Sequence, residues 1–210
     1  MLESMKEYTL LWAVLGISLL GCIFLWYLAM KSSQERTRRR NEEIARLTYE
    51  RELREEFANP TQQLLIDTPP ARLIEGLSSN VQTWLEAQPD MRAAFHALPE
   101  QKRWVYALGF LVQESREALS EFFRKNGDPL TTAAMEAVQM IIGGEFAEVF
   151  NQEFAAYDND NEEVSLLDKE ILLLDARFHA LLLQFGENVL YAEIKEHILS
   201  NSIIFLVNIE

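Results

Sequence analysis

Six large apolar side chains recur every three or four positions near the end of the chain, and this spacing is typical of a helix. They are Leu167, Ile171, Leu174, Phe178, Leu181 and Phe185. Such steps keep all six on one side of a helix, whereas a strand would send alternate residues to opposite faces. Shorter series with the same spacing occur in residues 104–122, 146–154 and 191–198. The sequence therefore predicts an all-α domain of about seven helices.

Prolines mark where this domain begins. Asn59-Pro60 and Thr68-Pro69-Pro70 interrupt the helical pattern, because proline lacks a backbone donor and restricts the residue before it. We therefore expect an acidic all-α globular domain over residues 60–210. Gly186 is among the predicted helix ends. Only Ile203–Val207 has a composition compatible with a short terminal strand.

An uncharged segment lies near the start of the chain. Tyr8–Met30 comprises 23 residues without a formal charge, enough for a helix of about 35 Å. The segment predicts a single transmembrane helix over 8–30, within an N-terminal membrane anchor of residues 1–30. Leu19-Leu20-Gly21-Cys22 resembles a lipoprotein cleavage box, which would make Cys22 a lipidated first residue. Because eight apolar residues follow that cysteine directly, the sequence favours an uncleaved anchor.

Basic residues flank this segment unequally. Before it stands only Lys6, and after it come Lys31, Arg36, Arg38, Arg39 and Arg40. Positively charged flanks stay on the cytoplasmic side, so we expect a single-pass protein of the bacterial inner membrane with a cytoplasmic C-terminal domain. The same cluster also suits anionic lipid headgroups, although a simple stop-transfer flank explains it as well.

Charges of both signs dominate the segment that follows. Between residues 31 and 56 there are 8 basic and 7 acidic side chains, interleaved along the chain. Glu42, Arg46, Glu50 and Arg54 alternate in sign at a spacing of four, which stabilises a helix. We therefore expect a charged helical stalk and linker over residues 31–59. Its apolar residues do not sustain a heptad, so a coiled-coil homo-oligomer through this segment stays an open alternative.

Catalytic motifs are missing from the sequence. It has three histidines and one cysteine, with no zinc-protease motif, no glycine-rich phosphate loop and no nucleophile elbow. Asp175 with His179 and Glu193 with His197 have helical i,i+4 spacing, which suits half of a metal site but is more common in surface pairs. The sequence therefore predicts no enzyme activity, no catalytic residue, no metal and no cofactor.

The acidic residues are concentrated in the C-terminal part of the chain. The whole chain has 33 acidic and 19 basic side chains, a balance that disfavours direct binding of nucleic acid. Residues 127–210 alone carry 16 acidic and 3 basic side chains. We expect Glu145, Glu148 and Glu153 to project from a helix toward solvent, followed by further acids in a loop. The predicted partner-binding residues are Glu145, Glu148, Glu153, Asp158, Asp160, Glu162 and Glu163. Ordinary acidic surface is an equally good interpretation of this strip.

Part of the chain resembles a known family. The segments 113–128, 135–158 and 166–185 contain Phe122-Phe123, Asn126-Gly127, Ile142-Gly143 and Leu174-Asp175-Ala176-Arg177-Phe178. Over residues 100–205 this pattern resembles the DNA-mimic-protein-like family of acidic all-helical domains, although Ser115-Arg116-Glu117 stands where that family has glycines. The resemblance implies carboxylates that imitate DNA phosphates and occupy a DNA-binding protein, or a related inhibitory role such as toxin immunity.

Two classes of function other than the leading one remain open. The leading hypothesis is a membrane-anchored acidic module that binds and restrains a basic protein, such as a DNA-binding protein. One alternative is an immunity protein against a toxin. The other is a scaffold subunit of a membrane-envelope complex, in which the anchor and stalk matter more than the acidic surface.

Overall fold

The computed structural model describes residues 26, 30, 35–116, 118–158 and 161–207. The chain divides into two units, Met1–Arg51 and Glu52–Glu210. In the first unit, the continuous described part is a helix whose charged side chains are exposed. Within it Arg38 Nε lies 2.7 Å from Glu42 Oε1, and Arg46 Nε lies 3.7 Å from Glu50 Oε1. The predicted charged helix with i,i+4 ion pairs is therefore confirmed for residues 35–51.

The membrane anchor predicted from the sequence requires correction. No helix among the residues that the structure describes is both long enough and apolar enough to span a bilayer. Apart from Trp26 and Met30, the segment Tyr8–Met30 lies outside those residues. The cytoplasmic location inferred from this segment stays a prediction.

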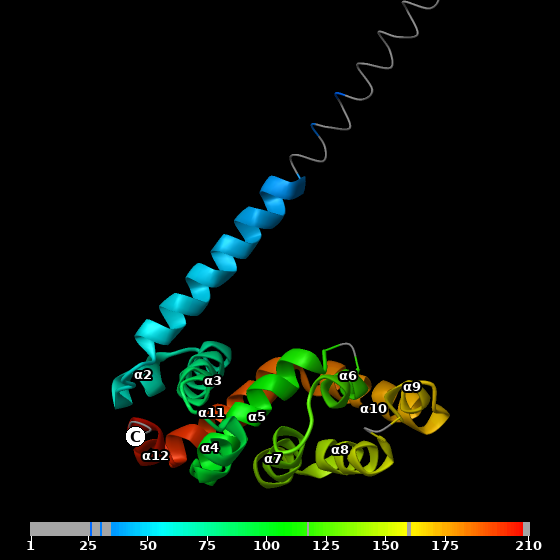
Figure 1. Cartoon of the computed structure of the whole chain (residues 1–210). Helices are drawn as coiled ribbons and strands as arrows, with labels where there is room; N and C mark the ends of the chain where they lie inside the picture. The colour runs from blue at the N-terminus through cyan, green and yellow to red at the C-terminus, as the bar shows by residue number, and fades with distance from the viewer. Residues whose placement is uncertain (1–25, 27–29, 31–34, 117, 159–160, 208–210) are drawn as a thin grey trace, which may run out of the picture. The chain divides into compact units, whose positions relative to one another are not determined.

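The second unit consists of helices, and its described residues contain no strand (Figure 1). The all-α prediction is confirmed, but the described residues form more helices than the seven expected. After the end of the first helix at residue 56, they are α2 (Gln62–Asp67), α3 (Pro70–Glu86), α4 (Met91–Ala97), α5 (Glu100–Glu114), α6 (Leu119–Lys125), α7 (Leu130–Ala137), the π-helical turn η1 (Val138–Ile142), α8 (Gly144–Ala156), α9 (Glu162–Ser165), α10 (Lys169–Phe185), α11 (Glu187–Ser200) and α12 (Ser202–Leu206).

Local caps explain much of this subdivision. Asp90 Oδ1 accepts the backbone N–H of Ala93 at 3.0 Å and starts α4, and Pro99 directly precedes α5. Gly186 separates α10 from α11 with a φ of 77°, a conformation that favours glycine. The possible strand at Ile203–Val207 is wrong, because Ser202–Leu206 forms α12.

The second unit begins at Glu52, before the boundary predicted at residue 60. Leu53 and Phe57 are buried in its core, and the Asn80 side-chain amide donates to the backbone carbonyl of Phe57. A Cβ built on Gly76 would lie 2.2 Å from the Phe57 ring, so α3 passes this ring at a position where only glycine fits. The end of the charged helix is thus part of the domain.

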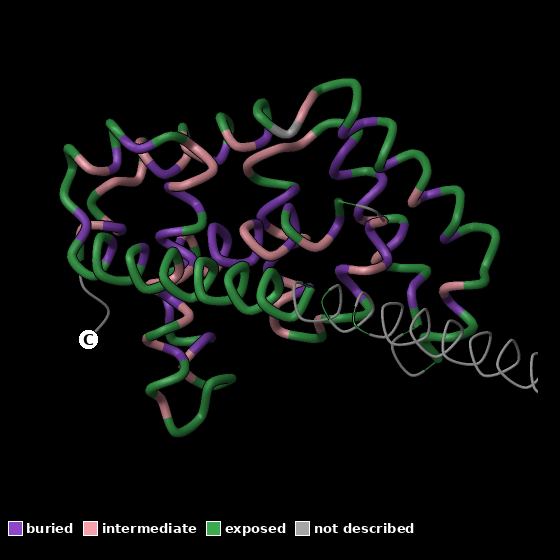
Figure 2. The backbone as a smooth tube through the Cα atoms, turned by 90° about the horizontal axis from the view of Figure 1, so that it is seen from above, coloured by how far each residue is buried: buried purple, intermediate pink, exposed green. Residues whose placement is uncertain are grey.

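One continuous core joins these helices (Figure 2). Helix α5 packs against α3 and α7, and α10 packs against α8. Of the six apolar residues whose spacing predicted a helix, the middle four are buried: Ile171, Leu174, Phe178 and Leu181. The expectation that the first and last are also buried is wrong. Leu167 precedes the first turn of α10 and is 79% exposed, and Phe185 at the last turn is 45% exposed.

Two lysines serve internal contacts. Lys195 Nζ on α11 donates to the backbone carbonyls of Ile66 and Thr68 at 2.7 and 2.6 Å, and so satisfies the C-terminal end of α2. Lys102 Nζ donates to the carbonyl of Val207 at 2.6 Å, and burial lowers the pKa of this amine. These two cations bind backbone carbonyls at the C-terminal ends of α2 and α12.

Candidate partner-binding surface

The acidic residues predicted to bind a partner do not all share one environment. Glu145 and Glu148 are exposed on α8, and Glu162 and Glu163 are exposed on α9. Asp158 is also exposed, and its backbone N–H donates to the Ser165 hydroxyl at 2.9 Å. This bond connects the end of α8 to α9. Asp160 lies outside the described residues.

Glu145 is already engaged by a cation. Its Oε1 accepts from Arg177 Nη2 at 2.8 Å and from Arg177 Nε at 3.0 Å, and both side chains are about half exposed. Arg177 lies on α10, so the pair links the first turn of α8 to the middle of that helix. The pair neutralises one end of the predicted acidic strip.

Glu153 does not project toward solvent, and this part of the prediction is wrong. Its exposed fraction is 0%, because it lies on the side of α8 that packs into the core. It follows Val149 by four residues and Phe150 by three, and these spacings place all three on one side of the helix. Glu153 is therefore an internal carboxyl rather than a surface charge.

The carboxyl of Glu153 faces a second acid across the interface of α8 and α10. It lies beside Asp175, whose Oδ1 accepts the backbone N–H of Ser120 at 2.9 Å and whose Oδ2 accepts the Ser120 hydroxyl at 2.8 Å. Burial, and then the charge of Asp175, raise the pKa of Glu153 to about 9. Neither Glu153 oxygen has a donor among the described residues. A protonated Glu153 satisfies both groups, because its O–H then donates a hydrogen bond to the carboxylate of Asp175.

Aromatic rings from α6, from α8 and from the residue after α8 pack against one another. The ring of Tyr157 lies 5.5 Å from that of Phe123, which lies 5.2 Å from the ring of Phe150. Burial, and then the charge of Glu162, raise the pKa of the Tyr157 hydroxyl. Tyr157, the first residue after α8, thus anchors the link between α8 and α9 in this aromatic cluster.

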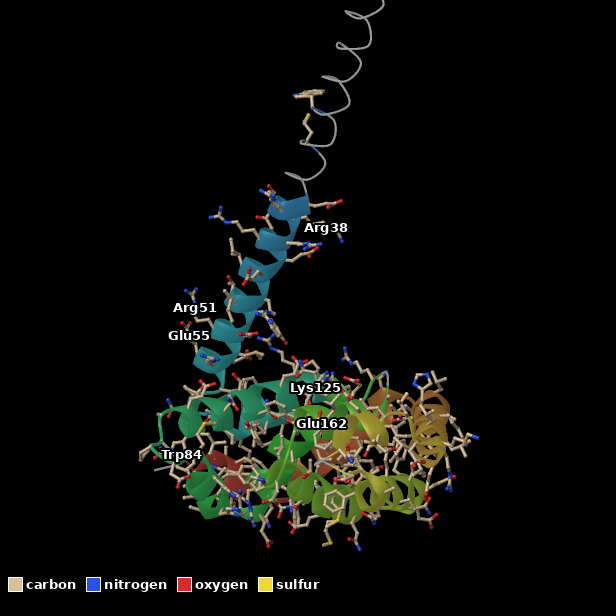
Figure 3. The ribbon with its side chains drawn as sticks, turned by 45° about the vertical axis from the view of Figure 1, so that its right-hand side comes forward. Arg38, Arg51, Glu55, Trp84, Lys125 and Glu162 are labelled. Carbon is tan, nitrogen blue, oxygen red and sulfur yellow. The ribbon has the colours of Figure 1, made fainter. Side chains whose placement is uncertain are left out.

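Basic side chains near the acidic surface are already paired. Arg124 Nη2 on α6 donates to Glu121 Oε2 at 2.6 Å, and Lys125 Nζ lies 3.9 Å from the same oxygen. Arg124 also experiences the charge of Glu162 on α9. Figure 3 labels Glu162 and Lys125 on these two helices. The cations of α6 therefore partly offset the negative charge of α9, although both are paired with Glu121.

The predicted membrane-flanking residues lie in the first unit. Arg36, Arg38, Arg39 and Arg40 are exposed on the helix of residues 35–51, and Lys31 lies outside the described residues. Arg38 donates to Glu42. An interaction of this cluster with lipid stays a prediction.

The histidine pairs do not form a metal site in the described part of the chain. Asp175 accepts from Ser120, and the ring of His197 lies 6.0 Å from that of Trp104. Burial lowers the pKa of His197. Among the described residues no group of three His, Cys, Asp or Glu side chains is arranged to hold a metal ion. The expectation of no metal, cofactor or enzyme activity stays a prediction.

Sequence reasoning missed an apolar surface on α10. The side of this helix that faces away from the core also carries large apolar residues, most of them more than half exposed. We call this surface the outer face of α10, and it consists of Leu172, Leu173, Ala176, Ala180 and Leu183. The signal was present, because residues 171–174 are all apolar and no helix can bury four consecutive side chains on one side.

Comparisons with protein-family models, with curated proteins and with solved structures found no match. The resemblance to DNA-mimic proteins therefore stays a prediction.

Proposed function

We propose that the domain of residues 52–210 is a non-catalytic protein-interaction module that binds a basic partner protein through the surface of α8 and α9. The observation that supports this proposal is the set of exposed carboxylates at Glu148, Glu162 and Glu163, in a stretch of chain without a basic residue from 145 to 163. Like charges gathered in one stretch of chain repel one another, and a basic partner relieves that repulsion and is steered by the same field.

The distribution of basic side chains also supports a basic partner. Residues 127–210 contain three basic side chains, of which Arg177 pairs with Glu145 and Lys195 holds the end of α2. Lys169 is the third and is exposed. The excess of carboxylates on the C-terminal helices therefore produces a strong negative electrostatic field at their surface. DNA-binding proteins belong to the proposed class of partner, because their phosphate-binding surfaces are basic.

A defined peptide tests the proposal. Full-length protein is titrated into a fluorescent lysine-rich peptide that has no apolar side, and the Kd is measured by anisotropy at several salt concentrations. We expect binding that weakens steeply with salt, because exposed charges are screened over about 10 Å at 0.1 M. Replacing Glu148, Glu162 and Glu163 together with Gln should weaken binding at least about tenfold, or about 1.4 kcal/mol.

A matched variant controls for net charge. Glu35, Glu43 and Glu52 are exposed on the first helix, so replacing them with Gln removes the same charge at a different place. This control should retain most of the affinity. Equal losses in the two triple variants would show that only the total charge matters, and would contradict the proposed surface.

A further inference from the structure

The outer face of α10 is an unusual surface for a helix on the outside of a domain. Leu173 is 71% exposed and Leu183 is 74% exposed, although the opposite side of the same helix is fully packed. Leu172 is also exposed, as are Val164 and Leu167 in the segment just before the helix. Exposed apolar residues that gather on one side of an element mark interaction sites more often than scattered ones do.

The shape of this face fits another helix. Leu172 and Leu173 lie at one end and Leu183 at the other, about 16 Å apart along the axis. Between them are Ala176 and Ala180, whose methyl groups leave the middle of the face low. A partner helix can approach closely over small residues, while leucines on either side supply apolar contacts. Partner anchors at i, i+4 and i+7 match this length.

Charges around the face indicate which helix it accepts. Exposed acids precede α10 and occupy its first turn: Glu162 and Glu163 lie on α9, and Asp168 and Glu170 lie at the start of α10, with Lys169 between them. These carboxylates complement a helix with basic flanks. A second copy of the chain would bring the same acids and a net charge of -14 to the interface, so repulsion opposes that occupant.

We propose that the outer face of α10 is the docking site for an amphipathic helix of the basic partner, with leucines against Ala176 and Ala180 and lysines or arginines against the acids at its N-terminal end. This inference rests on the proposed function and specifies the element of the partner that is recognised. Apolar contacts supply affinity, and the surrounding carboxylates select the sign of the partner's charge.

The test compares three peptides on the full-length protein. The first is an amphipathic helix with leucines on one side and lysines on its flanks. A scrambled peptide of the same composition has no apolar side, and a third peptide has glutamates in place of the lysines. We expect the amphipathic basic peptide to bind at least about tenfold more tightly than either of the others.

A triple variant locates the site. Leu172→Gln, Leu173→Gln and Leu183→Gln together should remove the advantage of the amphipathic peptide and leave the binding of the scrambled one unchanged. Glutamine is a good helix former, so α10 should be retained, as circular dichroism and thermal melting can verify. The matched control replaces Ile66, Met140 and Ile203, which are exposed on α2, η1 and α12, with Gln and should keep the advantage.

Each remaining outcome is decisive. Equal affinity for the amphipathic and scrambled basic peptides would overturn the docking site while the proposed function stands. Failure of both basic peptides to bind would remove the proposed function together with this inference. Tighter binding of the glutamate peptide would show that the charge assignment is wrong. A stable dimer in sedimentation that the leucine variant dissolves would identify a second copy as the occupant and overturn the proposal.

Discussion

Glu153 on α8 and Asp175 on α10 bring two carboxyl groups together inside the domain, and only Asp175 has hydrogen-bond donors from elsewhere in the described chain. The pair therefore requires a proton on Glu153. Because its pKa rises from an ordinary value of 4.5 to about 9, the folded domain binds this proton more tightly than the unfolded chain does. The stability that this bound proton gives the folded domain is fully present below about pH 4.5 and is lost as pH rises toward 9.

Replacing Glu153 with Gln should therefore stabilise the domain, and the gain should grow with pH. Glutamine keeps the shape and donates an N–H to Asp175 without needing a proton. Between about pH 5 and pH 8, the difference in free energy of unfolding from wild type should increase by up to about 1.4 kcal/mol per pH unit. Urea denaturation at a series of pH values measures it. Glu148→Gln on the exposed side of α8 is the control, and a pH-independent difference for Glu153→Gln would contradict the protonated pair.

Phe178 should be among the largest contributors to the core. It is buried on α10, and its ring meets that of Phe146 on α8 edge to face at 5.7 Å. Phe178→Ala should lower the free energy of unfolding by about 3 to 5 kcal/mol, because it leaves a cavity and removes a ring contact. Leu183→Ala on the outer face of the same helix should change it by less than about 0.5 kcal/mol. Similar losses at the two positions in chemical denaturation would contradict the assignment of the two faces.

Gly76 should not tolerate a side chain. A Cβ at this position meets the Phe57 ring at 2.2 Å, so Gly76→Ala should separate α3 from the end of the first helix and cost about 1 to 3 kcal/mol. Gly127 has open space around its Cβ position and a backbone that needs no glycine, which makes Gly127→Ala the matched control. Thermal melting distinguishes the two. A melting temperature in Gly76→Ala equal to that of the control would show that Phe57 is not held against α3.

Some features of the fold follow from local sequence and others do not. The helical content and the stop at Gly186 depend on spacing and backbone preference within one segment, and both are confirmed. The burial of Phe57 depends on Gly76, about twenty residues away, and the charged residues around Phe57 give no sign of it. The buried end of the first helix therefore belongs to the unit that begins at Glu52.

The candidate site shows the same division. Charge alone predicts its exposed acids correctly. For Glu153 charge predicts a surface position, but its position on the helix predicts burial. The spacing from Val149 and Phe150 already placed it on the buried side. The outer face of α10 is different. The spacing of Ile171, Leu174 and Phe178 identifies the side that is buried, and the exposed second apolar side is indicated only by the unbroken apolar run at residues 171–174.

Zero-length cross-linking tests the central claim, that the surface of α8 and α9 binds a basic partner. A carbodiimide joins a carboxylate to a lysine amine only when the two are in contact, and mass spectrometry identifies the joined residues. With the lysine-rich peptide bound to the full-length protein, the links should concentrate on Glu148, Glu162 and Glu163 and disappear at high salt. Links distributed over the exposed acids of the whole chain, or concentrated on the helix of residues 35–56, would contradict the account.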